Sequence, residues 1–299
     1  MIKMKTIDTK NIKKSVFILK REYNYYVSVL KRNYLRKCTY IGITGSAGKT
    51  LTKEFIHNIA SHYVSCNKSY LSRNTILDVA ETIYSLNKRD ELCAVELSGH
   101  MPGQLDRPLR MLRPHIGVLT KIAREHYSHF HSIEGIASEK SKLIRALPKN
   151  GTAILNIDDP LVKSIGKSCS CRIIWVGESE GADIRLIGVE STWPDPLRLR
   201  IEHGGRTYDV NTQLHGKHLA LSVLCSLGVA LAVGIPIETE VLSFNALEDR
   251  VFYEQEFDVS AAGWGDTSAY GGTNYFFFHS DWHTGGSESY DYNFTGYGV

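Results

Sequence analysis

The chain has 299 residues, of which 42% are hydrophobic and 22% are charged, so it is long enough for one large or two ordinary globular domains. It contains no run of roughly 18 apolar residues that could span a membrane, and its first residues lack the apolar core of a secretory signal. Six cysteines are scattered without a C-x-x-C pair, which argues against a zinc site or a disulfide scaffold. Together these features predict a cytoplasmic protein.

The net charge of +3 is unevenly distributed along the chain. All 35 lysines and arginines lie at or before Arg250, whereas residues 1–250 contain only 25 of the 32 acidic residues. A positive body suits an anionic ligand such as a nucleotide. The charge is too diffuse, and too little interleaved with aromatic residues, to predict nucleic-acid binding.

Residues 1–38 form the first predicted segment and hold eleven lysines and arginines against two acidic residues. Between residues 12 and 35 the apolar side chains recur at steps of three and four, which predicts a basic amphipathic helix. Such a helix can lie on a membrane surface. Packing on the following domain or on a partner subunit is the favoured interpretation.

Residues 39–237 alternate short apolar strands with helical stretches. The continuous apolar runs predict a parallel sheet with helices on both faces, an α/β fold. After Gly181 the pattern alternates, which predicts a small antiparallel region with a hairpin turn at 203–205. We expect the parallel strands at 40–44, 92–97, 116–120, 152–157 and 172–177, one helix at about 49–62 and another at 217–234 that Gly234 closes.

The end of the chain differs in composition. Residues 238–258 are interpreted as the remnant of a following domain. Residues 259–299 are rich in Gly, Tyr, Phe, Ser and Asp and contain no lysine or arginine. They show no sustained hydrophobic period, so we expect a disordered tail or one foreign to the fold.

The segment GITGSAGKT, residues 42–50, joins the first central strand to a helix. This arrangement is typical of a phosphate-binding loop, because the backbone N–H groups of the turn point at the anion. Lys49 supplies a positive charge for the β- and γ-phosphates, and the Thr50 hydroxyl is a Mg²⁺ ligand in such loops. Ile43 occupies the first glycine position of the usual pattern. The predicted nucleotide contacts in the loop are Thr44, Gly45, Ser46, Ala47, Gly48, Lys49 and Thr50.

Five segments in this order resemble the Mur ligases, ATP-dependent enzymes that join an amino acid or peptide to a carboxylate. The loop is the first, and the others are AVELSGHMPGQLD (94–106), GVLTKIAREHYSHFHSIEGIASEKSKL (117–143), GTAILNIDDPLV (151–162) and LHGKHLALSVLCSLGVALAVGI (214–235). The likeness covers about residues 38–250 and is greatest to the branch that adds D-alanyl-D-alanine to a muropeptide precursor. It implies amide formation through an acyl phosphate in peptidoglycan-precursor synthesis, with ATP and Mg²⁺ as cofactors.

The resemblance also implies roles for four later residues. Glu96 matches the magnesium-binding glutamate, which in the family holds a second Mg²⁺ together with the residues matched by His126 and a carbamylated Lys140. Asn156 matches a nucleotide contact. Lys49, His126 and Lys140 are therefore the predicted catalytic residues, and Thr50, Glu96, His126 and Lys140 the predicted metal ligands.

Each of these assignments has a structural alternative. Glu96 can be a solvated or salt-bridged carboxylate at a strand end, and His126 an exposed histidine beside two others. Lys140 can belong to a solvated helix face, and Asn156 can be a turn residue after a strand. A carbamylated Lys140 also requires the free amine, so burial or nearby cations must lower the pKa of the lysine from about 10.4.

The chain departs from the family in several ways. Lys121, Leu219 and Ser222 replace asparagines that the family often carries, the last two near the adenine. The N-terminal domain that grips a UDP-linked substrate and the C-terminal domain that binds the incoming amino acid are expected to be missing, or to come from a partner chain. The expected substrates are a muropeptide-like or small-molecule carboxylate and an amino acid or dipeptide. The alternatives are a P-loop ATPase or kinase that makes no amide, and an inactive nucleotide-binding remnant.

Overall fold

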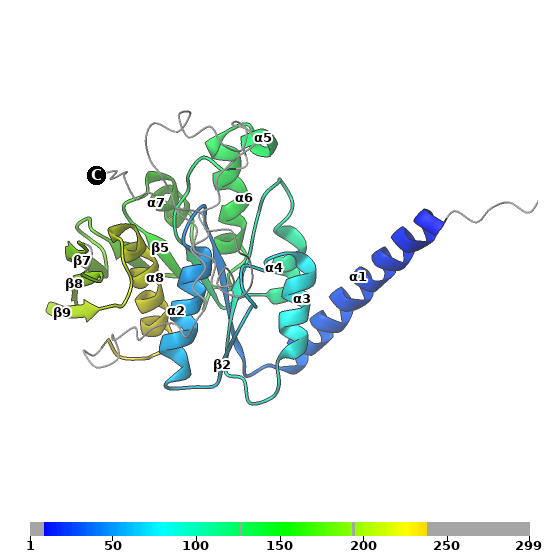
Figure 1. Cartoon of the computed structure of the whole chain (residues 1–299), viewed down its shortest axis with the longest axis horizontal. Coiled ribbons are helices and arrows are strands. Elements are labelled where there is room, and N and C mark those ends of the chain that lie inside the picture. Colours follow the sequence, from blue (N-terminus) through cyan, green and yellow to red (C-terminus); the bar gives the residue numbers. More distant parts are fainter. Residues whose placement is uncertain (1–8, 126, 193–194, 238–299) are drawn as a thin grey trace, which may run out of the picture.

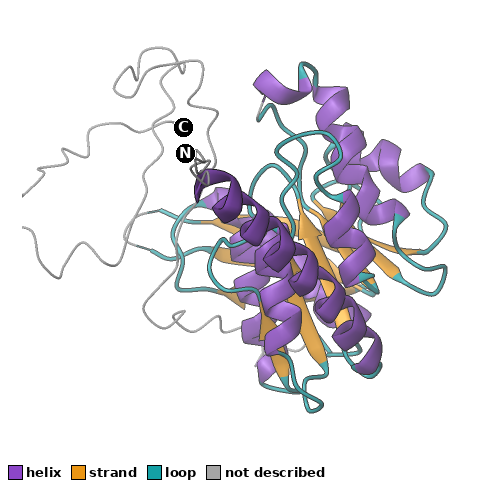
Figure 2. Ribbon diagram, turned by 90° about the vertical axis from the view of Figure 1, so that its right-hand side faces the viewer, coloured by secondary structure: helices purple, strands orange, loops and turns teal. Residues whose placement is uncertain are grey.

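The computed structural model describes residues 9–125, 127–192 and 195–237. The predicted domain remnant at 238–258 and the tail at 259–299 lie outside the described residues, and so does His126. Within the described part, one sheet carries helices on both of its faces (Figures 1 and 2).

The sheet has nine strands in the order β2-β3-β1-β4-β5-β6-β7-β8-β9. Neighbouring strands from β2 to β7 are parallel, whereas β8 pairs antiparallel with both β7 and β9. The predicted antiparallel region therefore continues the parallel sheet at one edge. The strands are β1 (Thr39–Thr44), β2 (Cys66–Lys68), β3 (Leu92–Glu96), β4 (Ile116–Leu119), β5 (Thr152–Asn156), β6 (Arg172–Gly177), β7 (Ile184–Glu190), β8 (Arg198–His203) and β9 (Arg206–Asn211).

Two helical layers cover the sheet. Apolar residues of α2 and α8 form one core with one face of the strands, and those of α3, α4, α6 and α7 form a second core with the other face. Tyr25 and Val29 of α1 pack on the edge of the second core. The helices are α1 (Thr9–Tyr34), α2 (Lys49–Ser61), α3 (Ile76–Ser85), α4 (Asp106–Leu112), α5 (Tyr127–Phe130), α6 (Ile133–Arg145), α7 (Pro160–Lys167) and α8 (Ala220–Ala232), with a 3₁₀ turn at Lys217–Leu219.

The strand residues explain the layering. All five residues of β3 and of β5 are buried, as expected for parallel strands with both faces covered. In β1, Tyr40 belongs to one core and Ile41 to the other, because successive side chains of a strand point to opposite faces. The continuous apolar runs of the sequence are thus confirmed as central strands.

Two glycines bring α6 unusually close to the sheet. Gly42 of β1 and Gly117 of β4 are paired neighbours in the sheet. A Cβ atom added to Gly42 would lie 2.8 Å from Cδ1 of Leu143, and one added to Gly117 would lie 3.1 Å from Cδ1 of Leu147. This close approach sets the distance of α6, and of every side chain on it, from the carboxyl end of β1.

The turn chemistry agrees with the predicted ends of two elements. The β8–β9 turn contains Gly204 and Gly205, both with positive φ, as a two-residue hairpin requires. Gly234 has a φ of +82° and follows α8, where Gly234 donates to the Leu231 carbonyl and Ile235 to the Ala230 carbonyl. This is the paired hydrogen bonding that ends many helices.

Several short elements were given no bounds in the sequence prediction. The strand β2 has only three residues, α5 has four, and α4 and α7 have seven and eight. Too few residues repeat in such segments to reveal a hydrophobic period. Within the described residues, no helix is both long and apolar enough to cross a membrane.

Candidate active site

The predicted phosphate loop lies at a reversal point of the sheet. Residues 45–48 connect β1 to α2, and β1 is flanked by β3 on one side and β4 on the other. The chain leaves β1 toward β2 and β3 on one side and continues from β4 to β6 on the other. In open parallel sheets, ligands bind at the carboxyl ends of the strands at such a point.

Glycine is required at two positions of the loop. Gly45 has a φ of +150°, and a Cβ atom there would lie 1.9 Å from Oγ1 of Thr120. Gly48 has a φ of +79° and is the N-cap of α2, and its Cβ atom would lie 2.6 Å from Oγ of Ser222. The loop is therefore held against β4 and α8 at a distance that no larger residue permits.

Neighbouring segments fix the loop through its hydrogen bonds. The Ser46 amide donates to the Lys121 carbonyl at 2.8 Å, and the Thr120 hydroxyl donates to the Ala47 carbonyl at 2.6 Å. The Ser46 hydroxyl also accepts from the amide of Ala123 at 2.9 Å. The segment after β4 thus supports the loop from outside.

Several polar groups of the loop remain open among the described residues. The amides of Ala47, Gly48 and Thr50 donate to no other described residue. Oγ1 of Thr44 is buried, and within the same described part it has no hydrogen-bond partner. Open amides at the start of a helix are the groups that bind a phosphate.

Thr50 and Glu96, which are both predicted metal ligands, lie next to each other. Oγ1 of Thr50 donates to Oε2 of Glu96 at 2.7 Å, and Nδ2 of Asn74 donates to Oε1 at 3.0 Å. Glu96 ends β3 and is 1% exposed, while its amide donates to the hydroxyl of Ser69. A solvated carboxylate at a strand end is therefore not what the structure shows.

Two lysines converge on one carbonyl of the loop. Nζ of Lys49 lies 3.1 Å and Nζ of Lys140 lies 3.0 Å from the Gly45 oxygen. Both side chains are buried, so Lys140 does not belong to a solvated helix face. Oε1 of Glu125, also buried, lies 2.5 Å from Nζ of Lys140. Carbamylation of Lys140 would have to displace this ion pair.

The acidic turn after β5 has internal partners. Oδ1 of Asn156 accepts from the amide of Asp158 at 3.0 Å, which is a turn role. Asp158 accepts from the amide of Glu178, and Asp159 caps α7 while also accepting from the amide of Ile122 at 2.7 Å. Through Asp159 the turn supports the segment that carries Lys121. The nucleotide contact of Asn156 stays a prediction.

Two of the three family departures contact the loop. Lys121 is exposed two residues after β4, and its carbonyl accepts from the Ser46 amide. Leu219 is buried, and the hydroxyl of Ser222 donates to the Gly48 carbonyl at 3.3 Å. Ser222 therefore supports the loop itself. His126 lies outside the described residues, so its role as a metal ligand stays a prediction.

Sequence reasoning missed several supporting residues. Thr120 ends a predicted strand, which is a usable signal because strand ends meet at this edge. Asn74 lies in a loop that Lys53 holds by donating to the Leu71 carbonyl, and no local pattern marks either residue. Burial lowers the pKa of Lys53, and the neighbouring Glu54 carboxylate opposes that shift.

Comparisons with known proteins agree with this geometry. Residues 43–230 match the family model described as the Mur ligase middle domain. A UDP-N-acetylmuramoyl-tripeptide--D-alanyl-D-alanine ligase of Mycobacterium bovis is 27% identical over 216 residues, which are 70% of this chain and 41% of the relative. The ligase of the same name from Bacillus subtilis is 24% identical over 220 residues, 70% of this chain and 44% of the relative.

Solved structures show the same fold. MurF from Acinetobacter baumannii superposes with a TM-score of 0.71 at 23% identity, covering 78% of this chain and 52% of that one. MurF ligase from Thermotoga maritima, in complex with ADP, gives a TM-score of 0.68 at 23% identity and covers 74% and 51%. The chain thus spans less than half of the length of the curated relatives above. Because the family model covers most of the described residues, including the loop, the chain belongs to the Mur ligase family and carries its middle domain.

Proposed function

We propose that this chain binds ATP with Mg²⁺ and serves an ATP-dependent ligase that forms an amide bond between a carboxylate and an amine. The observation that carries the proposal is the loop at 45–50, with open amides on one side and the Thr50–Glu96 pair on the other. The relatives named for joining D-alanyl-D-alanine to a tripeptide precursor support this chemistry, as does the fold shared with an ADP complex.

The residues present fit a magnesium nucleotide. Mg²⁺ prefers oxygen ligands, and it is usually held by one or two carboxylates together with phosphates and water. Thr50 and Glu96 offer a hydroxyl and a buried carboxylate 2.7 Å apart. Among the described residues, no three His, Cys, Asp or Glu side chains lie together as a candidate metal site. When bound, Mg²⁺ neutralises charge on the phosphates.

The reaction needs an activated acyl group. The substrate carboxylate attacks the γ-phosphorus of ATP, the bond to the bridging oxygen breaks, and ADP leaves with its electron pair. The amine then attacks the acyl carbon, inorganic phosphate leaves, and the amine loses a proton. Lys49 and the loop amides stabilise charge on the transferring group, which is mainly a matter of positioning and electrostatics.

Lys140 is the second residue of this proposal. Its position at the Gly45 carbonyl places it beside the phosphate loop, where the family resemblance puts a carbamylated lysine. The Glu125 carboxylate holds the unmodified amine in an ion pair, so carbamylation would replace that pair by a metal contact. His126 and Asn156 keep their proposed roles as metal ligand and nucleotide contact. A cytoplasmic location belongs to the same proposal, because reducing conditions keep the six cysteines free.

Titration calorimetry with magnesium and a non-hydrolysable ATP analogue tests the nucleotide site. We expect binding by the full chain and a loss of roughly 100-fold or more in affinity for Lys49→Ala, because a charge-assisted contact to phosphate is removed. Lys149→Ala, at an exposed lysine, is the matched control. Absence of binding by the unaltered chain would refute the proposal.

A phosphate-release assay separates the chemical alternatives. Release that requires both a carboxylate and an amine supports amide formation. Release with the carboxylate alone favours a kinase or ATPase, and binding without turnover favours a nucleotide-binding remnant.

A further inference from the structure

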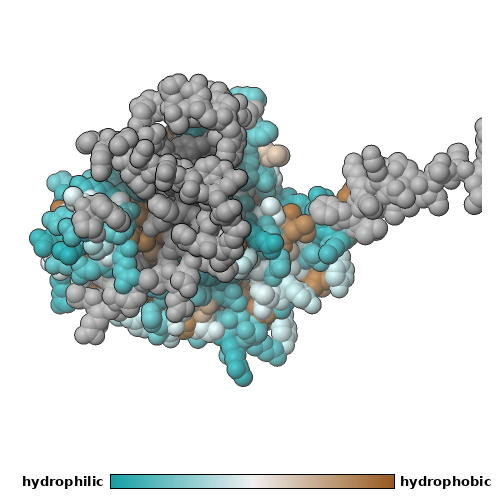
Figure 3. Space-filling view, in the orientation of Figure 1, coloured by the Kyte–Doolittle hydropathy of each residue, from teal (hydrophilic) through white to brown (hydrophobic). Residues whose placement is uncertain are grey.

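Helix α1 carries an uncovered apolar stripe, made of Leu19, Tyr23, Tyr26, Leu30 and Tyr34. The first four follow one another at steps of four, three and four residues, so they lie on one side of the helix. The exposed fractions of the five residues are 69%, 67%, 63%, 69% and 63%. In Figure 3, brown surface lies on the described part of α1 beside its grey end. These residues account for five of the eleven large hydrophobic side chains that are exposed in the described part of the chain.

The opposite side of α1 is fixed to the body by polar contacts. The hydroxyl of Ser28 donates to the Ala80 carbonyl at 2.9 Å, and Nε of Arg32 donates to the Leu112 carbonyl at 2.9 Å. Such bonds set the rotation of the helix about its own axis. The stripe therefore faces outward because of how α1 is anchored.

A second anchor lies along the side of the helix that faces α4. Arg107 binds both carboxylate oxygens of Glu22, at 2.8 and 2.6 Å, and its guanidinium lies over the ring of Tyr25. This side chain pairing satisfies Glu22, which is the only acidic residue of α1. The same helix contains seven lysines and arginines, so its net charge is positive.

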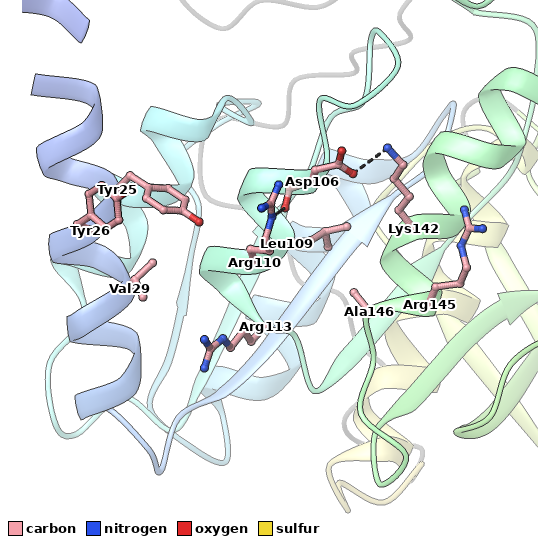
Figure 4. Close-up of a pocket in the computed structure, with 10 residues that line it drawn as sticks. All are labelled: Tyr25, Tyr26, Val29, Asp106, Leu109, Arg110, Arg113, Lys142, Arg145 and Ala146. Carbon is pink, nitrogen blue, oxygen red and sulfur yellow. Dashed lines mark hydrogen bonds and ion pairs between the residues drawn. The ribbon is translucent and has the colours of Figure 1, made fainter. Parts of the chain in front are cut away.

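A basic groove adjoins the stripe. It lies between α1, α4 and α6, has a volume of about 760 Å³, and includes Tyr26 of the stripe among its lining (Figure 4). Its cations are Arg110, Arg113, Lys142 and Arg145, whereas Asp106 is its one acidic lining residue and is paired with Lys142 at 2.7 Å. Stripe and groove together form one surface, apolar along α1 and positive beside it.

We propose that this surface docks the protein onto an anionic lipid membrane. An amphipathic helix with leucine and tyrosine on one face and lysine and arginine around it lies in the plane of the interface. Tyrosine suits this position, because its ring is apolar and its hydroxyl stays hydrated. The cations of the groove would face the phosphate headgroups, where each contributes electrostatic attraction.

The tyrosines of the stripe decide against a second copy as the occupant. Two α1 helices packed stripe to stripe would bury the side chains of Tyr23 and Tyr26, which are 67% and 63% exposed. Their hydroxyls would lose water without gaining partners, at a cost that a wet interface avoids.

Vesicle co-sedimentation of the full chain tests the proposal. One set of vesicles contains phosphatidylcholine alone, and the other contains equal parts of phosphatidylcholine and phosphatidylglycerol. We expect binding at least about tenfold tighter to the anionic vesicles, weakening as salt is added.

Two pairs of matched variants locate the surface. Tyr23→Ser/Leu30→Ser should weaken binding about tenfold or more because it removes inserted apolar area. Its control is Tyr63→Ser/Ile187→Ser, which removes one tyrosine and one aliphatic residue exposed elsewhere.

The second pair of variants tests the groove. Arg110→Gln/Arg113→Gln should weaken binding to anionic vesicles about tenfold or more. Its control, Arg198→Gln/Arg206→Gln at exposed arginines of β8 and β9, should leave binding unchanged.

The remaining outcomes overturn the proposal. The proposal is wrong if the chain does not sediment with either kind of vesicle at low salt. It is also wrong if Tyr23→Ser/Leu30→Ser and its control lose the same amount of vesicle binding. Light scattering tests for a third contradicting outcome. If the unaltered chain is a dimer and Tyr23→Ser/Leu30→Ser is a monomer, a second copy covers the stripe. Unchanged circular dichroism and melting of each variant verify that it folds, as expected for exposed positions.

Discussion

The phosphate loop and helix α1 differ in which groups they leave exposed. In the loop, residues 45–50 are enclosed by β4, α8 and the segment after β4, and the groups left open are polar. In α1, the anchors are polar and the groups left open are apolar. One region therefore exposes hydrogen-bond donors suited to an anion, whereas the other exposes side chains suited to an apolar environment.

The difference shows how each region depends on its surroundings. The loop depends on steric fit, because a single added carbon at Gly45 meets Thr120. Helix α1 depends on the packing of Tyr25 and Val29 and on a few separate hydrogen bonds and ion pairs to α3 and α4, each of which contributes modestly. Substitutions should thus have large effects at the loop and graded effects along α1.

The largest effect is expected for Gly45→Ala. The new methyl group would occupy the position of the Thr120 hydroxyl, and the backbone would be held at a φ of +150°. We expect a loss of about 2–5 kcal/mol in the free energy of unfolding, measured by urea denaturation, and loss of nucleotide binding. Gly204→Ala is the control, since its Cβ atom meets nothing within 4 Å and should cost about 1 kcal/mol. Equal costs at the two positions would contradict the steric argument.

The next effect tests the segment that follows Glu96. The buried carboxylate of Glu139 accepts from the amides of Gly103 and Leu105, both at 2.9 Å. Glu139→Ala leaves these amides without their acceptor and should cost about 2–3 kcal/mol of stability. Glu134→Ala, at an exposed position on the same helix α6, should cost much less. A cost for Glu139→Ala no greater than for the control would show that water replaces the carboxylate.

A pH effect is expected at the base of β1. Burial and the neighbouring Arg32 lower the pKa of His115, whose Nδ1 accepts from the amide of Tyr40 at 3.0 Å. Because the unfolded chain binds a proton at about pH 6.5 and the folded chain only at lower pH, stability should fall as pH drops below about 6.5. His115→Gln should flatten that part of the curve in urea denaturation at several pH values. A curve that keeps the same slope in the variant would assign the effect to another group.

The smallest effect is expected at the anchor of α1. The Arg107 guanidinium lowers the pKa of Glu22, so the pair stabilises the folded chain above the ordinary glutamate value of about 4.3. This contribution should decline as pH falls through the lowered value, because the carboxylate is then protonated in both states. Comparison of urea midpoints for the unaltered chain and Glu22→Gln should show a difference at neutral pH that disappears in acid. Glu81→Gln, at a more exposed pair with Arg73, should show a smaller difference.

The sequence predicted the central sheet and the loop because their signals are local. The apolar runs at β1, β3 and β5 are continuous, and the glycines and lysine of the loop stand in one short segment. Helix α1 was predicted from its period, and its packing on the body is confirmed by Ser28 and Arg32. The sequence could not show that the apolar stripe faces outward, because the hydrophobic period does not reveal which side of a helix is covered.

The supports of the site could not be predicted in the same way. Asn74 reaches Glu96 across 22 residues of sequence, and Glu139 holds the segment that follows Glu96 through amides 34 and 36 residues away. Glu125 lay beside the predicted histidine, yet its pairing with Lys140 depends on how α6 crosses the sheet. Such contacts follow from tertiary packing, which no local pattern encodes.

The glycine pair beneath α6 has a consequence for how this chain can vary. Gly42 and Gly117 face Leu143 and Leu147, so the size allowed at one position is set by the residue opposite it. Gly42→Ala should be harmful in the present background but better tolerated once Leu143 is shortened, which makes the two positions epistatic. We therefore expect substitutions at this interface to arise in compensating pairs. Each pair would preserve the distance between α6 and the sheet, and with it the position of Lys140 beside the phosphate loop.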